Sequence, residues 1–241
     1  MTLPLVSPLL TGLINIAREK YKAENEAWVQ LSLLLSGRFN LDAALISLQW
    51  QGEVDILLRC LEDEINIKSN ASEPDFSSHY LLMLSETWVV GCYEILRAFY
   101  QRDRDAAKAG MPKSGVSDID EFRLIFNEFE ILRMPMAKYE IAKDYELKHP
   151  LPMWGVDDDE SKPPEFYDPK DPSRFHIMPR GLSPRGSARW LAFDVRNSRQ
   201  HGVERRDLAD RLLSLLKSVK GAGELEAEQN AASQDLARLG R

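Results

Sequence analysis

The sequence predicts a mainly α protein, in which a bundle of about four long helices precedes a small C-terminal β-hairpin plus helix. Three observations support this fold class. Apolar residues recur at spacings of three and four through most of residues 9–148, which is the periodicity of a helix face. The composition becomes proline-rich over residues 150–186. A short alternating segment then follows at residues 189–195, as expected for a strand.

The central helix of the bundle is predicted over Ser77–Arg102. Its apolar residues form two adjacent seams: Leu81, Leu84, Trp88, Cys92, Ile95 and Phe99 in the first, and Leu82, Val89, Tyr93, Leu96 and Tyr100 in the second. An apolar arc of this width exceeds the single stripe of a surface helix. We therefore expect neighbouring helices to pack against it on at least two sides.

An N-terminal helix is predicted from Pro8 to Leu35, since proline suits the first turn of a helix. Its expected buried face comprises Leu9, Leu13, Ile16, Ala17, Tyr21, Trp28, Leu31 and Leu35. The uncharged start of the chain lacks the basic residues and the cleavage pattern of an export signal. We therefore expect the first residues to pack as part of the bundle.

Two further helices complete the predicted bundle. One begins after Asn40 or Asp42 and buries Ala44, Leu45, Leu48, Val54, Leu57, Leu58 and Leu61, with Gly52 as a weak point. The other is capped by Ser117 or Asp118 and buries Phe122, Ile125, Phe126, Phe129, Leu132 and Met136. Pro135 should kink or restart this helix, which we expect to continue to His149.

The change in composition predicts four regions: a helical bundle over residues 1–149, a proline-rich acidic connector over 150–186, a hairpin and short helix over 187–219, and a disordered tail over 220–241. Trp154, Phe166, Tyr167 and Phe175 are expected to attach parts of the connector to the helices. The acidic run over residues 157–160 lacks the spaced ligands and turn glycine of a calcium loop. No metal site is predicted there.

The hairpin is predicted from period-two alternation. Trp190, Ala192 and Asp194 fall on one face of the strand Arg189–Val195, and Gln200–Glu204 returns as its partner. Asn197 and Ser198 suit the turn, and Asp207 is expected to cap the short helix.

Net charge, cysteine content and hydropathy indicate the cellular location and the kinds of partner to expect. The net charge of −7 argues against a broadly basic coat for nucleic acid. Cys60 and Cys92 lie in apolar helical patterns, which predicts free thiols and a reducing, cytoplasmic location. No apolar run approaches the roughly 18 residues that span a bilayer, so no membrane segment is predicted.

No nucleotide-binding, phosphate-binding, zinc-protease or nucleophile-elbow motif is present in the sequence. The four histidines lie far apart along the chain, so no zinc-ligand spacing can be formed from neighbouring residues. No cofactor is predicted. The first hypothesis is therefore a non-enzymatic helical interaction or regulatory module with a protein partner of unknown identity.

A second hypothesis comes from the string Arg196-Asn197-Ser198-Arg199-Gln200-His201. This R-N-x-x-x-H string resembles the motif of HEPN domains, the helical nucleases of bacterial toxin and defence systems. The resemblance implies a motif on a helix of the bundle, and a cleft that often lies at a homodimer interface. It also implies metal-independent cleavage of RNA, in which Arg196 would stabilise phosphate charge and His201 would assist attack by a ribose hydroxyl.

Arginines are also concentrated in the C-terminal module. The candidate binding residues are Arg189, Trp190, Arg199, Arg205 and Arg206. A hairpin that presents arginine beside tryptophan can contact a nucleic-acid backbone or an acidic protein. The same arginines can instead pair with the acidic connector, and the sequence leaves these alternatives open.

Overall fold

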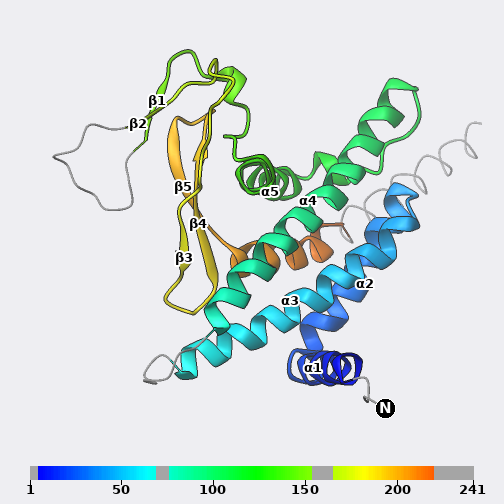
Figure 1. Ribbon diagram of the computed structural model, residues 1–241. Coiled ribbons are helices and arrows are strands. Elements are labelled where there is room, and N and C mark those ends of the chain that lie inside the picture. Colours follow the sequence, from blue (N-terminus) through cyan, green and yellow to red (C-terminus); the bar gives the residue numbers. More distant parts are fainter. Residues whose placement is uncertain (1–4, 69–75, 154–164, 220–241) are drawn as a thin grey trace, which may run out of the picture. The chain divides into compact units, whose positions relative to one another are not determined.

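The structure is a computed structural model of the 241-residue chain, and it describes residues 5–68, 76–153 and 165–219 (Figure 1). Its helices are α1 (Val6–Lys20), α2 (Lys22–Phe39), α3 (Ala43–Lys68), α4 (Ser77–Lys108) and α5 (Asp120–Lys138), with short 3₁₀ turns η1 (Val116–Asp118) and η2 (Asp144–Glu146). A further helix covers residues 205–219. The predicted mainly α class is confirmed.

The chain divides into two compact units, and each contains segments that are distant in sequence. The first unit comprises Met1–Ile56, Ile95–Ile125 and Ala209–Arg241, and the second comprises Leu57–Glu94 and Phe126–Leu208. Helices α3, α4 and α5 each contribute residues to both units. The predicted boundaries at residues 149 and 186 fall inside the second unit.

The core of the first unit is built around aromatic side chains. The ring of Phe39, at the end of α2, stacks on that of Phe99 in α4 with 4.7 Å between ring centres. Phe122 of α5 lies 6.3 Å from the same Phe39 ring. Trp28 is also buried, and its indole N–H donates to the Asp55 carboxylate at 2.8 Å. The central helix predicted over Ser77–Arg102 lies within α4, as its wide apolar arc indicates.

The N-terminal region differs from the prediction in two ways. The helix is not continuous, because Tyr21 leaves helical geometry (φ −114°, ψ 46°) between α1 and α2. In addition, Leu9, Leu13 and Ile16 are exposed, so the expectation that they line the bundle is wrong. Because the chain bends at Tyr21, α1 does not continue along α2. Ala17, near the C-terminal end of α1, is the one buried residue of this helix.

The predicted hairpin is confirmed in the second unit. Strands β4 (Ala188–Asp194) and β5 (Arg199–Glu204) pair antiparallel, with Trp190 opposite Val203. Burial alternates along β4, where Ala188, Trp190 and Ala192 point into the core. A third strand, β3 (Arg180–Leu182), pairs with β4 on its other side (Figure 1). The third strand gives the hairpin the lateral support that two strands lack in water.

The connector contains more regular structure than predicted. Besides β3, it holds the antiparallel pair β1 (Leu151–Met153) and β2 (Glu165–Tyr167). Of its predicted aromatic anchors, Tyr167 is buried whereas Phe166 and Phe175 are exposed. Trp154, the acidic run at 157–160 and the tail at 220–241 lie outside the described residues.

Helix α5 passes through Pro135 and ends at Lys138, so the expected continuation to His149 is wrong. Proline removes one helical hydrogen bond, and Tyr139 then adopts a left-handed conformation with φ of 57°. The chain turns, and Ile141 packs in a small cluster with Tyr167 and Val195. Packing of Ile141 in this cluster directs the chain away from the axis of α5.

Gly52 allows α3 to approach Trp28 of α2. A Cβ atom on Gly52 would lie 2.6 Å from the Cβ and Cγ atoms of Trp28, whereas one on Gly37 would meet nothing within 4 Å. We expect Gly52→Ala to lower the free energy of unfolding by about 1–3 kcal/mol through overpacking. In contrast, Gly37→Ala should raise it by about 0.5–1 kcal/mol, because alanine favours a helix interior. Urea unfolding of both variants measures this, and equal effects would contradict the packing of Trp28 on α3.

Candidate functional site

The string Arg196–His201 forms the turn between β4 and β5 and the first part of β5, rather than part of a helix. The carboxylate of Asp194 organises this turn by accepting hydrogen bonds from the backbone N–H of Arg196 at 3.1 Å and from the side-chain amide of Asn197 at 2.6 Å. Partial burial acts to raise the pKa of Asp194, but these hydrogen bonds outweigh it and hold the pKa below its ordinary value.

Each of the two candidate nuclease residues faces a carboxylate. The Nε atom of Arg196 lies 3.7 Å from Glu146, and His201 Nε2 lies 3.5 Å from Glu128. His201 pairs with Ala192 across the hairpin, while Arg196 projects from the exposed turn. The geometry therefore gives each side chain an acidic neighbour that would compete with a phosphate group, and the ribonuclease activity stays a prediction.

The five candidate binding residues are not on one surface. Trp190 and Arg205 are buried, so neither is open to a partner, and Arg206 is partly buried. Arg189 and Arg199 are exposed. The arginine-rich segment thus divides into residues that stabilise the fold and residues that face solvent.

Arg205 and Arg206 both bind the buried carboxylate of Glu62 on α3. Arg205 donates from Nε at 3.0 Å and from Nη2 at 2.6 Å, and Arg206 donates from Nη1 at 3.0 Å. The guanidinium carbon of Arg205 also lies 5.7 Å from the centre of the Trp88 ring, within range of a cation–π interaction. The helical periodicity of α3 predicts its apolar face but gives no sign that a carboxylate is buried on it.

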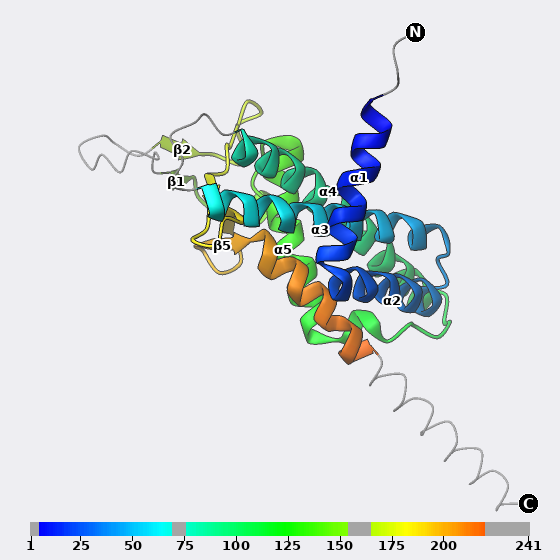
Figure 2. The ribbon, with the colours of Figure 1, turned by 90° about the horizontal axis from the view of Figure 1, so that it is seen from below.

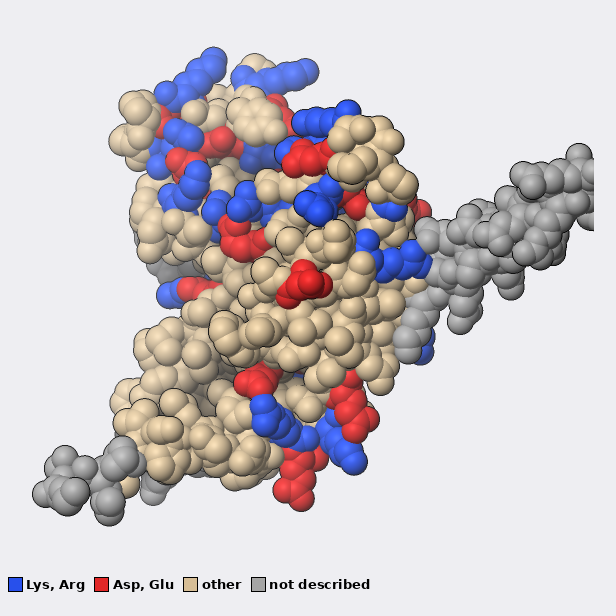
Figure 3. All heavy atoms as spheres, turned by 90° about the vertical axis from the view of Figure 1, so that its right-hand side faces the viewer, with Lys and Arg blue, Asp and Glu red and all other residues tan. Residues whose placement is uncertain are grey.

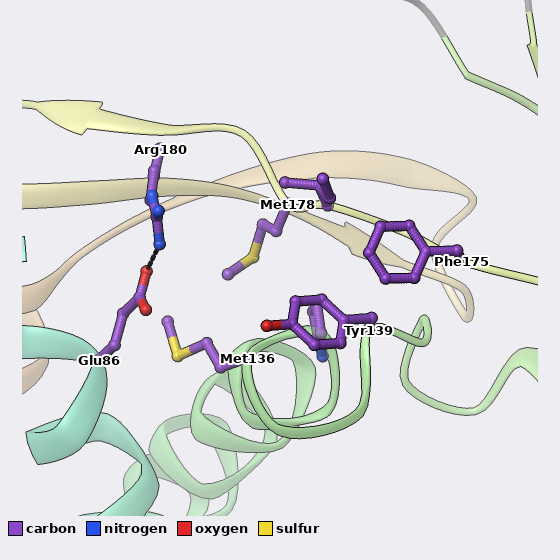
Figure 4. A pocket seen from close by; sticks show the side chains of 8 residues that line it. Glu86, Met136, Tyr139, Phe175, Met178 and Arg180 are labelled. Atoms are coloured by element: carbon purple, nitrogen blue, oxygen red, sulfur yellow. Dashed lines mark hydrogen bonds and ion pairs between the residues drawn. The ribbon is translucent and has the colours of Figure 1, made fainter. Parts of the chain in front are cut away.

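A pocket of about 330 Å³ lies in the second unit, between the end of α5 and the segment that leads into β3 (Figure 4). It is lined by Glu86, Pro135, Met136, Tyr139, Phe175, Ile177, Met178 and Arg180. Arg180 Nη1 donates to Glu86 at one end, and the rings of Tyr139 and Phe175 stack at the other, 4.9 Å apart. No local motif could have predicted this pocket, because Glu86 and Arg180 are separated by 94 positions.

His176 holds the wall of the pocket at the end of α5. The backbone N–H of His176 donates to the carbonyl of Tyr139, the residue after α5, at 2.8 Å. The buried His176 ring meets the edge of the Tyr167 ring, with 6.3 Å between ring centres. Burial lowers the pKa of His176. Tyr167 donates to Asp144 at 2.7 Å, and burial together with this bond raises its pKa to about 12. Both rings are therefore uncharged at neutral pH.

A larger pocket, of about 660 Å³, lies in the first unit near the end of α4 and is lined in part by Arg38, Arg102 and Lys113. Its buried carboxylate, Asp103, accepts hydrogen bonds from the backbone N–H of Ser114 at 2.8 Å and from the hydroxyl at 2.6 Å. These bonds hold the loop after α4 in place. We therefore assign Asp103 a structural role.

Comparison of the chain with protein families, with curated proteins and with solved structures gave no match. Within residues 5–68, 76–153 and 165–219, no three histidine, cysteine or acidic side chains are grouped as metal ligands. Among the same residues, no helix is both long and apolar enough to cross a membrane.

We expect the full chain to leave total RNA intact in the absence of added metal, because Glu146 and Glu128 face Arg196 and His201. Gel electrophoresis over a time course, beside the folded Arg196→Ala, His201→Ala double variant, measures this. Cleavage by the wild-type chain that is lost in the double variant would contradict the expectation and support the nuclease hypothesis.

We also expect the free energy of unfolding to depend on pH through His176. The folded-state pKa of this ring is below the unfolded value of about 6.5. The stabilisation is therefore fully present above about pH 6.5 and declines as the pH falls toward the lowered pKa. His176→Phe keeps an aromatic ring and removes the titration, so it should flatten this part of the profile. Identical profiles of wild type and variant in urea unfolding would contradict the assignment.

Proposed function

We propose that this chain is a self-associating helical interaction module, in which α1 of one copy docks on the first unit of a second copy. The observation that carries the proposal is the exposure of the apolar side chains of α1 before Arg18, where the helix carries no charged residue. Six large apolar side chains on or next to α1 are between 49% and 71% exposed: Leu5, Val6, Leu9, Leu10, Leu13 and Ile16. Soluble monomers rarely leave contiguous apolar surface of this kind in water.

These six side chains form one continuous face. At 3.6 residues per turn they fall within an arc of about 140° around the helix. The opposite side carries Ser7, Thr11 and Asn15, and no charged residue occurs from Leu5 to Ala17. In Figure 3, the surface of α1 at the lower left of the molecule carries few blue or red side chains. Figure 2 shows α1 extending beyond α2. This geometry supports docking in an apolar groove.

The first unit also carries a suitable receiving surface. Val29 and Leu33 are exposed on α2, and Ile46 and Trp50 are exposed on α3. Each pair is spaced by four residues and therefore lies on one side of its helix. Gln49 of α3 donates to Ser32 of α2 at 3.1 Å, so the two helices are in contact. The two helices run antiparallel, so the residues that directly follow Ser32 and Gln49 lie on the same side of the helix pair. These residues are Leu33 and Trp50, which are therefore neighbours.

Buried area favours a second copy as the occupant. Half of the surface of a 15-residue helix has an accessible area of about 400 Å², from its rise and diameter. A one-way contact would bury about 800 Å² on both sides together, which is typical of weak contacts. In a reciprocal contact, α1 of each copy would dock on the apolar surface of the other copy. Such a contact would bury about 1,600 Å², the size of a stable interface.

A membrane surface fits α1 less well. Amphipathic helices that bind lipid usually carry lysine and arginine on the polar face, whereas the polar face of α1 from Ser7 to Asn15 has only uncharged residues. A different protein could fill the same surface, whereas a second copy is known to supply both the apolar helix and the receiving surface.

We expect Leu10→Asp to convert a dimer into a monomer, because the carboxylate would be buried without a partner in the interface. Leu124→Asp is the matched control, since Leu124 lies on a helix of the same unit and both leucines are 54% exposed. Light scattering after size-exclusion chromatography, over a range of concentrations, measures the mass of each variant.

Trp50→Ser tests the receiving surface and should weaken the dimer as Leu10→Asp does. A wild-type chain that is monomeric at high micromolar concentration would overturn the proposal. Binding of that monomer to neutral or anionic vesicles would indicate that α1 binds lipid instead.

A further inference from the structure

We propose that the pocket formed by α4, the end of α5 and residues 175–180 binds a small carboxylate with an aromatic body. All of its lining residues belong to the second unit, so this site is separate from the α1 surface of the first unit. Neither the interaction hypothesis nor the nuclease hypothesis uses any of these residues.

The pocket suits the apolar part of such a ligand. Its volume of about 330 Å³ is near the lower end of the range for ligand pockets. At the packing density of protein interiors it accommodates about a dozen non-hydrogen atoms. Met136 and Met178 face each other across the space in Figure 4, and methionine adapts its shape and makes favourable contacts with aromatic rings. A single aromatic ring with a short side chain matches this size and lining.

The charged end of the pocket offers an anion the donors of Arg180. A guanidinium group has five N–H donors in a planar fork, and Arg180 uses Nη1 to bind Glu86. The Arg180 side chain is 53% exposed, whereas that of Glu86 is 28% exposed. The remaining donors of Arg180 are therefore accessible to a carboxylate, which they can bind in the bidentate geometry that arginine favours.

Tyr139 supplies a second polar group at the same place. Its hydroxyl points from the stacked rings into the space between the two methionines (Figure 4). Within the described part of the chain, this hydroxyl has no hydrogen-bond partner. It can therefore donate to a carboxylate held by Arg180.

The backbone of Tyr139 is an independent indication of a site. Its φ of 57° lies in the left-handed region, where glycine or asparagine usually ends a helix. A bulky residue in this conformation is strained, and such strain is concentrated at binding and catalytic sites. The phenol ring lines the pocket at this position, which glycine could not do.

The test uses the full-length chain and three probes that differ only in the polar end: 3-phenylpropionate, 3-phenylpropylamine and 3-phenylpropanol. Titration calorimetry or ligand-observed NMR measures each dissociation constant. We expect the carboxylate to bind about tenfold more tightly than the amine or the alcohol, which corresponds to one charge-assisted contact. Arg180→Gln should remove this preference. Glu86→Gln should strengthen carboxylate binding severalfold, because it removes the acidic competitor for Arg180.

Arg123→Gln is the matched control, since the Arg123 side chain is 54% exposed and also lies beside a carboxylate, that of Asp120, and it should leave the affinity unchanged. Each variant is compared after its unfolding midpoint has been shown to equal that of the wild type. A preference for the amine, equal binding of all three probes, no binding, or carboxylate binding that survives Arg180→Gln would each overturn the proposal.

Discussion

The second unit depends on one buried carboxylate. Glu62 is 1% exposed in its side chain and binds both Arg205 and Arg206. Leaving a buried ion without its partner lowers the free energy of unfolding by about 3–5 kcal/mol. Separation of Glu62 from the two arginines is therefore strongly unfavourable. The two arginines also begin the helix over residues 205–219, where the helix dipole disfavours positive charge, and Glu62 offsets that cost. One carboxylate on α3 thereby determines where β5 ends and the following helix begins.

The loop between β3 and β4 is held against α3 beside the same residue. Asn66 donates to the carbonyl of Arg185 at 2.8 Å. Gly186 has a φ of 76°, and a Cβ there would lie 3.0 Å from the carbonyl oxygen of Glu62. Only glycine suits both the conformation and the close approach. Since this loop leads directly from β3, its docking on α3 also sets the position of Arg180 opposite Glu86. The pocket is thus a consequence of how the sheet is attached to α3.

The spacing of apolar residues predicted those helices and strands whose buried face is formed within a single element. The apolar seams of α4 and the alternation around Trp190 both lie within one element, so their periodicity was sufficient. The burial of Glu62 depends on arginines that are 143 and 144 positions away, and no spacing within α3 indicates it. Similarly, the exposure of α1 depends on a bend at Tyr21, because the apolar pattern continues across the bend. The pocket residues come from three segments, and only the fold brings them together.

The construction of α1 supports the proposal that a partner completes this helix. Isolated helices of about 12–15 residues are marginal in water, and α1 has 15 residues with neither a side-chain N-cap nor an acidic residue in its first turn. Its C-terminal end is held by the pairing of Arg18 with Glu53, but an exposed pair of this kind contributes at most about 1 kcal/mol. Within a single copy, the apolar face therefore adds little burial to support the helix. Contact with an apolar groove would stabilise the helix and bury its face at the same time, so folding of α1 and association should be coupled.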